Sequence, residues 1–390
     1  MRGAGDARSG FLRARSAVTA AFATHAILSG SLGPWIPRLK SQAELDPAGL
    51  GVALTGYAAG LLLGTRVAGW ALRRVGGRPL VRAGIPALAV GFALLALPRG
   101  LGSMTTVFVG IGLAAGLVDV AMNTEAVAVE QGFGRTVLSM MHGTWSVSVF
   151  AGAAVASAAV AAGIPITVSL AASSAILAAT SFPLLRWLPT EPEDGPPAST
   201  AGRADHPLPP AGRVALLCLV AAAAFLTEGI AIEWSALYLR GSIGVAVGLA
   251  GLGVVAFSAG MAVARFAGDR LAARLGGIAM VRAGLAVAAV ALGAALLVDR
   301  FLTSILALAV MGLGLGPVVP FVFRAAAAAA GARRDGTALP IVVTAGYAGS
   351  IVGPLIVGFV ADSLGLRAAL TLPVLACGVA AFAATAMQDR

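Results

Sequence analysis

The sequence predicts an all-α membrane protein whose twelve transmembrane helices form two six-helix bundles. Of the 390 residues, 58% are hydrophobic and 11% are charged, whereas a soluble domain is about half apolar and a quarter charged. Apolar runs of about 20 residues recur along the chain, and each is long enough to cross a roughly 30 Å hydrocarbon layer as a helix. One long polar stretch separates six runs from the other six.

The expected spans follow the apolar runs in order. The first six begin near Val18, Leu50, Val81, Thr105, Val137 and Pro165. The second six begin near Val214, Val245, Ala279, Thr303, Leu339 and Ala368. Two arginines precede the first run, as in a signal peptide, but the eleven later runs favour a first helix that is retained.

The polar stretch from Pro189 to Arg213 is rich in proline and charge and has no apolar periodicity. Such a composition is typical of a flexible linker. The predicted organisation is therefore an N-terminal six-helix bundle over residues 1–189, a cytoplasmic linker over 190–212 and a C-terminal six-helix bundle over 213–390.

The two halves repeat one another. The stretch "TRVAGWALRRVGGRPLVRAG" from residue 65 aligns with "ARFAGDRLAARLGGIAMVRAG" from residue 264, so that Arg66 matches Arg265. "GLAAG" (112–116) likewise matches "GLGLG" (312–316). The repeat unit is therefore six helices. Two similar bundles joined by a linker are typical of a carrier that rocks one half against the other around a midplane site.

The net charge of +10 indicates topology rather than a nucleic-acid partner. If both termini are cytoplasmic, most of the 27 Lys and Arg residues fall in or beside cytoplasmic segments, which is the positive-inside bias. Membrane lipid is the expected partner of these charges. Lys40 is the only lysine, and no phosphate-binding loop surrounds it, so the chain carries no ATP-driven pump of that kind.

With its twelve spans, its linker and the loop after span 2, the chain resembles the major facilitator superfamily over nearly its full length. That loop is similar to the superfamily's "GxxxDRxGRR" signature, but an arginine stands where the family usually has aspartate. The missing aspartate usually forms a salt bridge on this side of the protein, and an Asp-Arg pair in the second-half loop could supply an equivalent one. The resemblance implies a gating loop made of Gly69, Arg73, Arg74, Gly76, Arg78, Asp269 and Arg270.

Two shorter motifs narrow the resemblance. "DVAMN" (119–123) resembles the acid-x-Ala-x-Asn of span 4 in fucose–proton symporters, which implies that Asp119 couples protons. Those symporters also carry an acid in span 1, where this chain has only His25 as a titratable group. "EGIAIEWSALYL" (228–239) is similar to a related, largely uncharacterised group of bacterial inner-membrane transporters. The implied location is a bacterial-type cytoplasmic (inner) membrane, crossed several times.

The acids inside the spans are the candidate proton carriers. Asp119 lies about 14 residues, or roughly 21 Å, into span 4, well inside the hydrocarbon. Asn123 and Glu130 share its face of the helix. An acid at this depth marks an ion or substrate pathway, and the alternative is a structural acid held by hydrogen bonds to Asn123 or a neighbouring helix. Glu228, about 15 residues into span 7, is the second candidate.

The remaining polar and aromatic residues of the spans are candidates for binding the solute. Trp234 could stack on a sugar-like ring or anchor at the membrane interface. His142 could donate a hydrogen bond to a substrate, or it could be a core residue whose hydrogen bonds are made within the protein. For His25 a structural role is favoured over a binding role. The full set of candidate binding residues is Asn123, His142, Trp145, Glu233, Trp234 and His25.

The predicted function is secondary active transport that is coupled to protons, works by alternating access and moves a small polar, sugar-like solute. Proton-driven efflux of an amphipathic drug or metabolite is one alternative, and a transporter-like solute receptor is another. No enzyme is expected, because the chain has no HExxH and no other catalytic motif. The expected partners are the solute, protons and lipid; no nucleic acid, obligatory protein partner, metal or cofactor is indicated.

Overall fold

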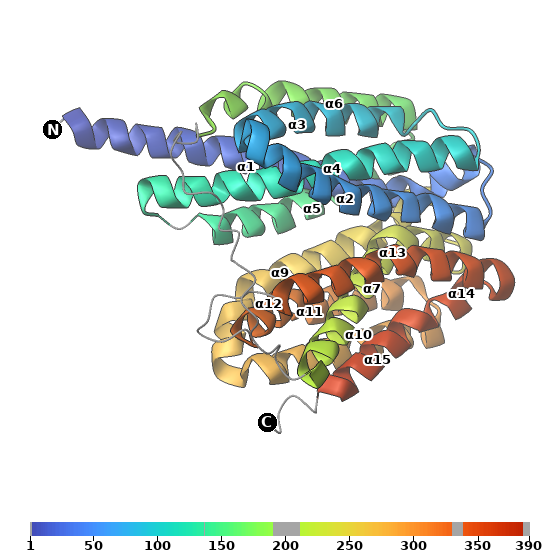
Figure 1. Ribbon diagram of the computed structural model, residues 1–390. Coiled ribbons are helices and arrows are strands. Elements are labelled where there is room, and N and C mark those ends of the chain that lie inside the picture. Colours follow the sequence, from blue (N-terminus) through green and yellow to red (C-terminus); the bar gives the residue numbers. More distant parts are fainter. Residues whose placement is uncertain (1, 136, 190–210, 330–337, 385–390) are drawn as a thin grey trace. The chain divides into compact units, whose positions relative to one another are not determined.

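The computed structural model describes residues 2–135, 137–189, 211–329 and 338–384 (Figure 1). Within these ranges every regular element is a helix, and no residue is in a strand. Ten helices in this part of the chain are long and apolar enough to cross a membrane. The predicted all-α membrane class is therefore confirmed.

Two compact units make up the chain, and the first contains residues 1–45 and 56–195. Its helix α1 extends well past its neighbours at the N-terminal end (Figure 1). The helices in this part of the chain are α1 (Arg2–Gln42), α2 (Pro47–Val75), α3 (Gly77–Leu94), α4 (Leu101–Phe133), α5 (Leu138–Ala161), α6 (Ile166–Ser181) and the 3₁₀ helix η1 (Leu184–Trp187).

The second unit contains residues 196–390 together with residues 46–55, which include the first two turns of α2. Its own helices are α7 (Ala211–Gly241), α8 (Val247–Ala250), α9 (Leu252–Leu275), α10 (Gly277–Val298), α11 (Phe301–Leu315), α12 (Val318–Ala329), α13 (Ala338–Leu364), α14 (Leu366–Ala369) and α15 (Thr371–Ala383).

Several expected spans consist of two helices. The span near Thr303 is divided into α11 and α12 at Gly316 and Pro317. Proline lacks a backbone N–H and its ring clashes with the preceding turn, so a break at this point is expected. By contrast, Pro354 lies within α13, which continues through it.

Glycines allow the helices of each unit to approach closely, and they do so at equivalent places. A Cβ at Gly112 of α4 would overlap the carbonyl oxygen of Tyr57 in α2. In the second unit, a Cβ at Gly312 of α11 would overlap the carbonyl oxygen of Phe257 in α9. Small residues at such crossings are typical of membrane helices. The repeated "GLAAG" and "GLGLG" segments therefore make the same kind of helix crossing.

The helix pairs α1/α5 and α7/α13 are built in the same way. A Cβ at Gly152 of α5 would overlap the carbonyl oxygen of Ile27 in α1, and one at Gly349 of α13 would overlap that of Ala222 in α7. The backbones of each pair are therefore in close contact at these glycines. The helices of these pairs carry several polar residues of the candidate site.

Candidate transport site

The predicted proton carrier Asp119 lies on α4 and is half-buried. The Asn123 side-chain amide, one turn later, donates a hydrogen bond to the Asp119 backbone oxygen at 2.8 Å and approaches its Oδ1 at 3.4 Å. No Lys, Arg or His in the described ranges forms an ion pair with Asp119. The carboxyl group therefore has a local amide neighbour and no cation that would hold it in its charged form.

The other two acids of α4 join this helix to its neighbours. Glu125 is only 1% exposed, and its carboxylate lies against Gly77 at the start of α3. Glu130 accepts hydrogen bonds from the backbone N–H groups of Val137 and Leu138 at 2.6 and 2.9 Å. Although Glu130 shares a helix face with Asp119, its carboxylate caps the start of α5. The sequence did not mark this role, because it depends on where α5 begins.

Aromatic rings and histidines meet between α1 and α5. The His25 and Trp145 rings are in edge-to-face contact, with centroids 4.8 Å apart and planes at 88°. Phe22 and His142 make a similar contact one turn away, at 6.0 Å and 81°. His25 is 2% exposed, and its Nδ1 is enclosed without a hydrogen-bond partner in the described residues. Three of the predicted binding residues are thus in one layer of the first unit.

In the second unit, the predicted acid Glu228 is engaged in an ion pair. Arg265 Nη2 of α9 lies 3.5 Å from Glu228 Oε1 of α7, and both side chains are about a quarter exposed, at 24% and 26%. Arg66, which is the sequence equivalent of Arg265, is exposed and has no carboxylate partner in the ranges the structure describes. The two arginines, equivalent in the repeat, therefore have different surroundings.

Further along α7, Glu233 is half-buried and Trp234 is 1% exposed. Glu233 Oε2 and Trp234 Nε1 are both enclosed and make no hydrogen bond in the part of the chain described here. An indole enclosed within the protein makes no contact with lipid headgroups, so burial does not favour a role for Trp234 as an interfacial anchor. Its enclosed N–H is a donor available to a ligand that reaches it.

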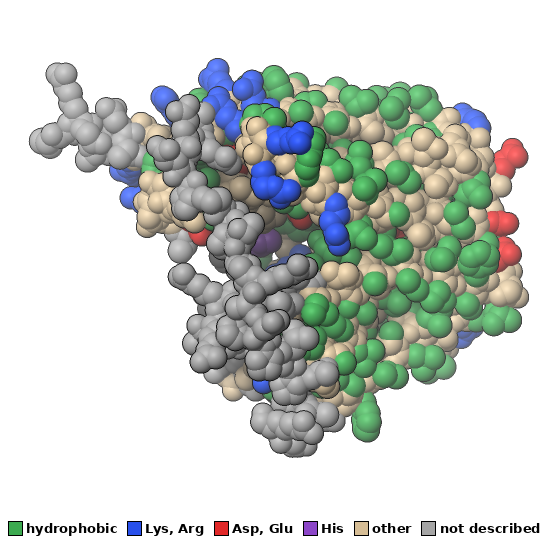
Figure 2. Space-filling view, in the orientation of Figure 1, with side chains coloured by type: hydrophobic (Ala, Val, Ile, Leu, Met, Phe, Trp, Pro, Cys, Tyr) green, Lys and Arg blue, Asp and Glu red, His purple; other side chains and the backbone are tan. Residues whose placement is uncertain are grey.

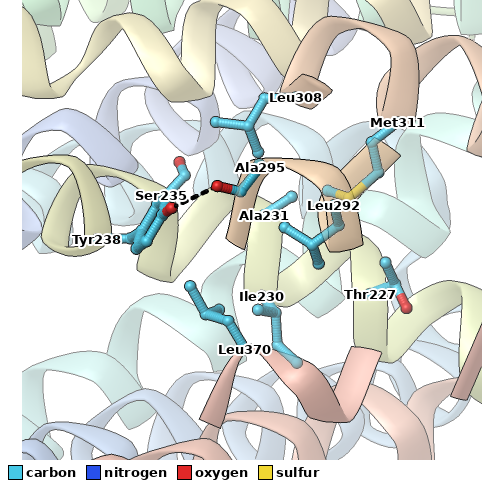
Figure 3. A pocket seen from close by; sticks show the side chains of 10 residues that line it. All are labelled: Thr227, Ile230, Ala231, Ser235, Tyr238, Leu292, Ala295, Leu308, Met311 and Leu370. Carbon is cyan, nitrogen blue, oxygen red and sulfur yellow. Dashed lines mark hydrogen bonds between the residues drawn. The ribbon is translucent and has the colours of Figure 1, made fainter. Parts of the chain in front are cut away.

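A small cavity opens beside the same helix, between α7, α10 and α11 (Figure 3). At one side of it the Tyr238 hydroxyl donates to the Ala295 backbone oxygen at 3.2 Å, as the dashed line shows. Tyr238 is also 3.1 Å from Asp299 Oδ1. The lining is mostly apolar: Thr227, Ile230, Ala231, Ser235, Tyr238, Leu292, Ala295, Leu308, Met311 and Leu370. None of these was a predicted site residue. Ile230, Ala231, Ser235 and Tyr238 belong to the 228–239 motif, but the cavity forms only where this part of α7 meets residues from distant segments such as Leu292 and Leu308.

The residues predicted to form a gating loop in the first half are mostly helical: Gly69, Arg73 and Arg74 lie in α2 and Arg78 lies in α3, so that only Gly76 stands between the helices. Arg73 donates to the Gly69 backbone oxygen at 2.8 Å, and the Arg78 guanidinium donates to the Arg186 backbone oxygen at 3.0 Å. Gly76, with φ of 75°, makes the turn between the helices, a conformation that side chains disfavour. The Arg74 guanidinium lies 4.2 Å from the Trp70 ring centroid. Asp269 and Arg270 were expected on a loop of the second half but lie within α9, and their side chains are outside the described residues.

Comparisons with known proteins agree with this architecture. The family model described as Major Facilitator Superfamily matches residues 216–389. An uncharacterized MFS-type transporter of Yersinia pestis is 30% identical over 340 residues, covering 86% of each chain. The membrane protein MosC of Rhizobium meliloti is 28% identical, covering 96% of this chain and 90% of its own.

Solved structures share the fold at low sequence identity. The nucleoside transporter NupG has a TM-score of 0.74 at 14% identity and covers 98% of this chain and 99% of its own. A bacterial homologue of the human lysosomal transporter Spinster has a TM-score of 0.73 at 16% identity, with 98% of both chains covered. The Yersinia pestis relative, at 30% identity over 86% of each chain, carries the family assignment; the family model agrees with it over the second half, and the solved structures confirm the fold. The chain belongs to the Major Facilitator Superfamily of membrane transporters.

Proposed function

We propose that the protein is a proton-coupled secondary transporter that moves a small polar, sugar-like solute by alternating access. In this proposal twelve spans cross a bacterial-type inner membrane, both termini are cytoplasmic, and the bundles 1–189 and 213–390 move about the linker 190–212. The observation that carries the proposal is Asp119. It is an acid within an apolar helix, half-buried and without an ion-pair partner in the described residues.

A carboxyl group in this setting can take up and release a proton as the surrounding water changes, because no fixed cation holds it charged. Glu228 is the second proposed proton group, and its ion pair with Arg265 would have to break when it is protonated. A membrane potential supplies about 2.3 kcal/mol per charge per 100 mV. At roughly 1.36 kcal/mol per tenfold, one proton is sufficient for about fiftyfold accumulation.

The solute would be bound by the remaining predicted residues. On the first unit these are Asn123, His25, His142 and Trp145, of which the last three lie in the aromatic layer between α1 and α5. On the second unit they are Glu233 and Trp234, whose enclosed polar atoms lack partners in the described residues. Flat aromatic rings combined with a few hydrogen-bonding groups suit the alternating apolar faces and hydroxyl groups of a sugar-like ring.

The test uses purified protein in liposomes that contain a pH-sensitive dye. Sugars, polyols, nucleosides, amino acids and drugs are added in turn, and both solute uptake and internal acidification are measured. With the correct solute, the wild-type protein acidifies the lumen and accumulates solute. Asp119→Asn should lose accumulation driven by a proton gradient but retain exchange of solute across the membrane, which also shows that the variant is folded.

The matched control is Asp46→Asn. Asp46 precedes α2 outside the apolar spans, and its carboxylate accepts a hydrogen bond from the Gly49 amide at 2.6 Å, which asparagine can also accept. Its coupling should equal that of the wild type. Proton-driven accumulation by Asp119→Asn at the wild-type level would refute the role of Asp119, and solute uptake without proton movement would refute the coupling.

A further inference from the structure

Five arginines lie together on the first unit: Arg73, Arg74, Arg78, Arg82 and Arg186, here called the arginine patch. They belong to the end of α2, the first turns of α3 and the 3₁₀ helix η1. Figure 2 shows Lys and Arg side chains gathered on the first unit near the end where α2 gives way to α3. No carboxylate in the described residues pairs with any member of the patch.

Backbone oxygens hold two of these side chains in place. Arg78 Nη2 donates to the Arg186 backbone oxygen at 3.0 Å, which ties the start of α3 to η1. Arg73 Nη1 donates to the Gly69 backbone oxygen at 2.8 Å. A guanidinium has five N–H donors, so each of these groups keeps several donors for another acceptor. The positive charges are therefore held in position, and no carboxylate among the described residues neutralises them.

The other three guanidiniums lie over aromatic rings. Arg74 is 4.2 Å from the Trp70 centroid, and Arg186 is 4.8 Å from the Trp187 centroid. Arg82 is 5.9 Å from the Phe182 centroid. Trp70 and Phe182 are 51% and 45% exposed. Tryptophan is enriched at headgroup depth, so the patch combines cationic groups with exposed apolar rings at the level of the membrane interface.

The positive-inside bias alone explains arginines at this end of the helices. It does not explain five of them in one place with no carboxylate partner in the described part of the chain, since like charges repel and surface arginines usually have carboxylates interspersed. In the repeat alignment, the equivalent segment of the second half has alanine (Ala272 or Ala273) where this half has Arg73, and it carries an acid, Asp269, directly after Gly268. An external anion would relieve the repulsion, and a phosphodiester accepts the bidentate hydrogen bonds that guanidiniums donate.

We propose that the arginine patch binds the headgroup of an anionic phospholipid, with the phosphodiester among the guanidiniums and the acyl chains beside Trp70 and Phe182. The exposed rings favour a lipid over free phosphate, because inorganic phosphate makes no use of apolar surface. This inference rests on the chain lying in a membrane and is independent of proton coupling. Occupancy of the patch would make the predicted gating segment at the end of α2 and the start of α3 sensitive to the lipid composition around the protein.

The experiment measures lipid binding to delipidated protein in neutral detergent by native mass spectrometry. Phosphatidylglycerol, phosphatidylcholine and inorganic phosphate are titrated separately, and then phosphate is added to the lipid-bound protein. Phosphatidylglycerol should remain bound where phosphatidylcholine dissociates, and equimolar phosphate should not displace it. Each arginine near a charged bilayer surface contributes about fivefold in binding, so Arg73→Gln/Arg78→Gln/Arg186→Gln should bind phosphatidylglycerol roughly a hundredfold more weakly.

The matched control is Arg38→Gln/Arg99→Gln/Arg240→Gln, which removes three exposed arginines outside the patch and should bind as the wild type does. If the patch triple variant fails to fold, Arg74→Gln/Arg82→Gln decides the question, because these side chains contact only aromatic rings within the described chain. Equal binding by wild type and patch variants, or equal retention of the two lipids, would overturn the proposal. Displacement of the lipid by equimolar phosphate would show a free-anion site and would also overturn it.

Discussion

Glu228 of α7 and Arg265 of α9 form an ion pair across two helices of the second unit, with Arg265 Nη2 3.5 Å from Glu228 Oε1. Its counterpart in the repeat, Arg66, is exposed and has no carboxylate partner among the described residues. Of these two equivalent arginines, Arg265 of the second unit is therefore in an ion pair, whereas Arg66 of the first unit is in none among the described residues. Asp119, by contrast, is a half-buried acid that forms no ion pair with any residue in the described chain.

The ion pair should be detectable as a coupling free energy. Because both partners are about a quarter exposed, solvent screening reduces their interaction, and we expect about 1 kcal/mol from a double-mutant cycle of Glu228→Gln and Arg265→Gln. Thermal unfolding in detergent, or denaturant titration where it is reversible, supplies the four stabilities. Glu233→Gln combined with Arg265→Gln serves as the control cycle. Additive losses in the Glu228 cycle would mean that the pair contributes nothing.

The glycine crossing of α2 and α4 offers a matched pair of substitutions on one helix. Gly112→Ala forces a methyl group into the backbone of Tyr57 and should destabilise the protein by about 1–3 kcal/mol, as overpacking does. Gly110→Ala has no heavy atom within 4 Å of the new Cβ and should be neutral or slightly stabilising, because alanine favours helix. Melting temperatures of the two variants in the same detergent make the comparison. Equal melting temperatures would show that α2 and α4 can separate without cost.

Substitutions at His25, whose ring contacts Trp145, distinguish a structural role of His25 from a role in binding the solute. His25→Phe keeps a ring against Trp145 and should retain the wild-type melting temperature, whereas His25→Ala should lose about 0.5–1.5 kcal/mol of the ring contact in addition to the cavity cost. If His25 also donates to the solute, His25→Phe should raise the KM for transport while stability is unchanged. Wild-type transport by a stable His25→Phe would restrict His25 to the structural role.

The Glu130 cap should control local opening at the start of α5. Glu130→Ala removes the acceptor of the Val137 and Leu138 amide hydrogens, so these two amides should exchange with deuterium faster than in the wild type. Exchange in the middle of α5 should be unaffected. Glu130→Gln, which keeps a side-chain oxygen, should be intermediate. Unchanged protection of both amides in Glu130→Ala would show that the carboxylate does not stabilise this turn.

The candidate site was predictable where its residues are close in sequence. Asp119 and Asn123 are four residues apart, so helix geometry alone puts them on one face, and the observed amide contact follows. The sequence marks Glu228 as a candidate proton carrier and Arg265 as the repeat equivalent of Arg66, but it does not predict that the two side chains meet. That contact depends on how far α7 and α9 are displaced along their axes, which apolar periodicity does not specify. The Tyr238–Asp299 contact, which joins α7 to the end of α10, was missed for the same kind of reason. The capping role of Glu130 was missed because it depends on where α4 ends and α5 begins.

By itself, the sequence determined the membrane class, the approximate positions of the helices, the repeat of the two halves and the acids buried in them. These follow from local physics: a segment about 20 residues long and apolar must cross the hydrocarbon as a helix, because its backbone groups have no other partners there. Only the tertiary structure decided which polar groups meet, namely Glu228 with Arg265, His25 with Trp145 and the arginines with their aromatic rings. Between apolar helices the register is set by close packing at glycines, and that packing involves residues far apart in the chain.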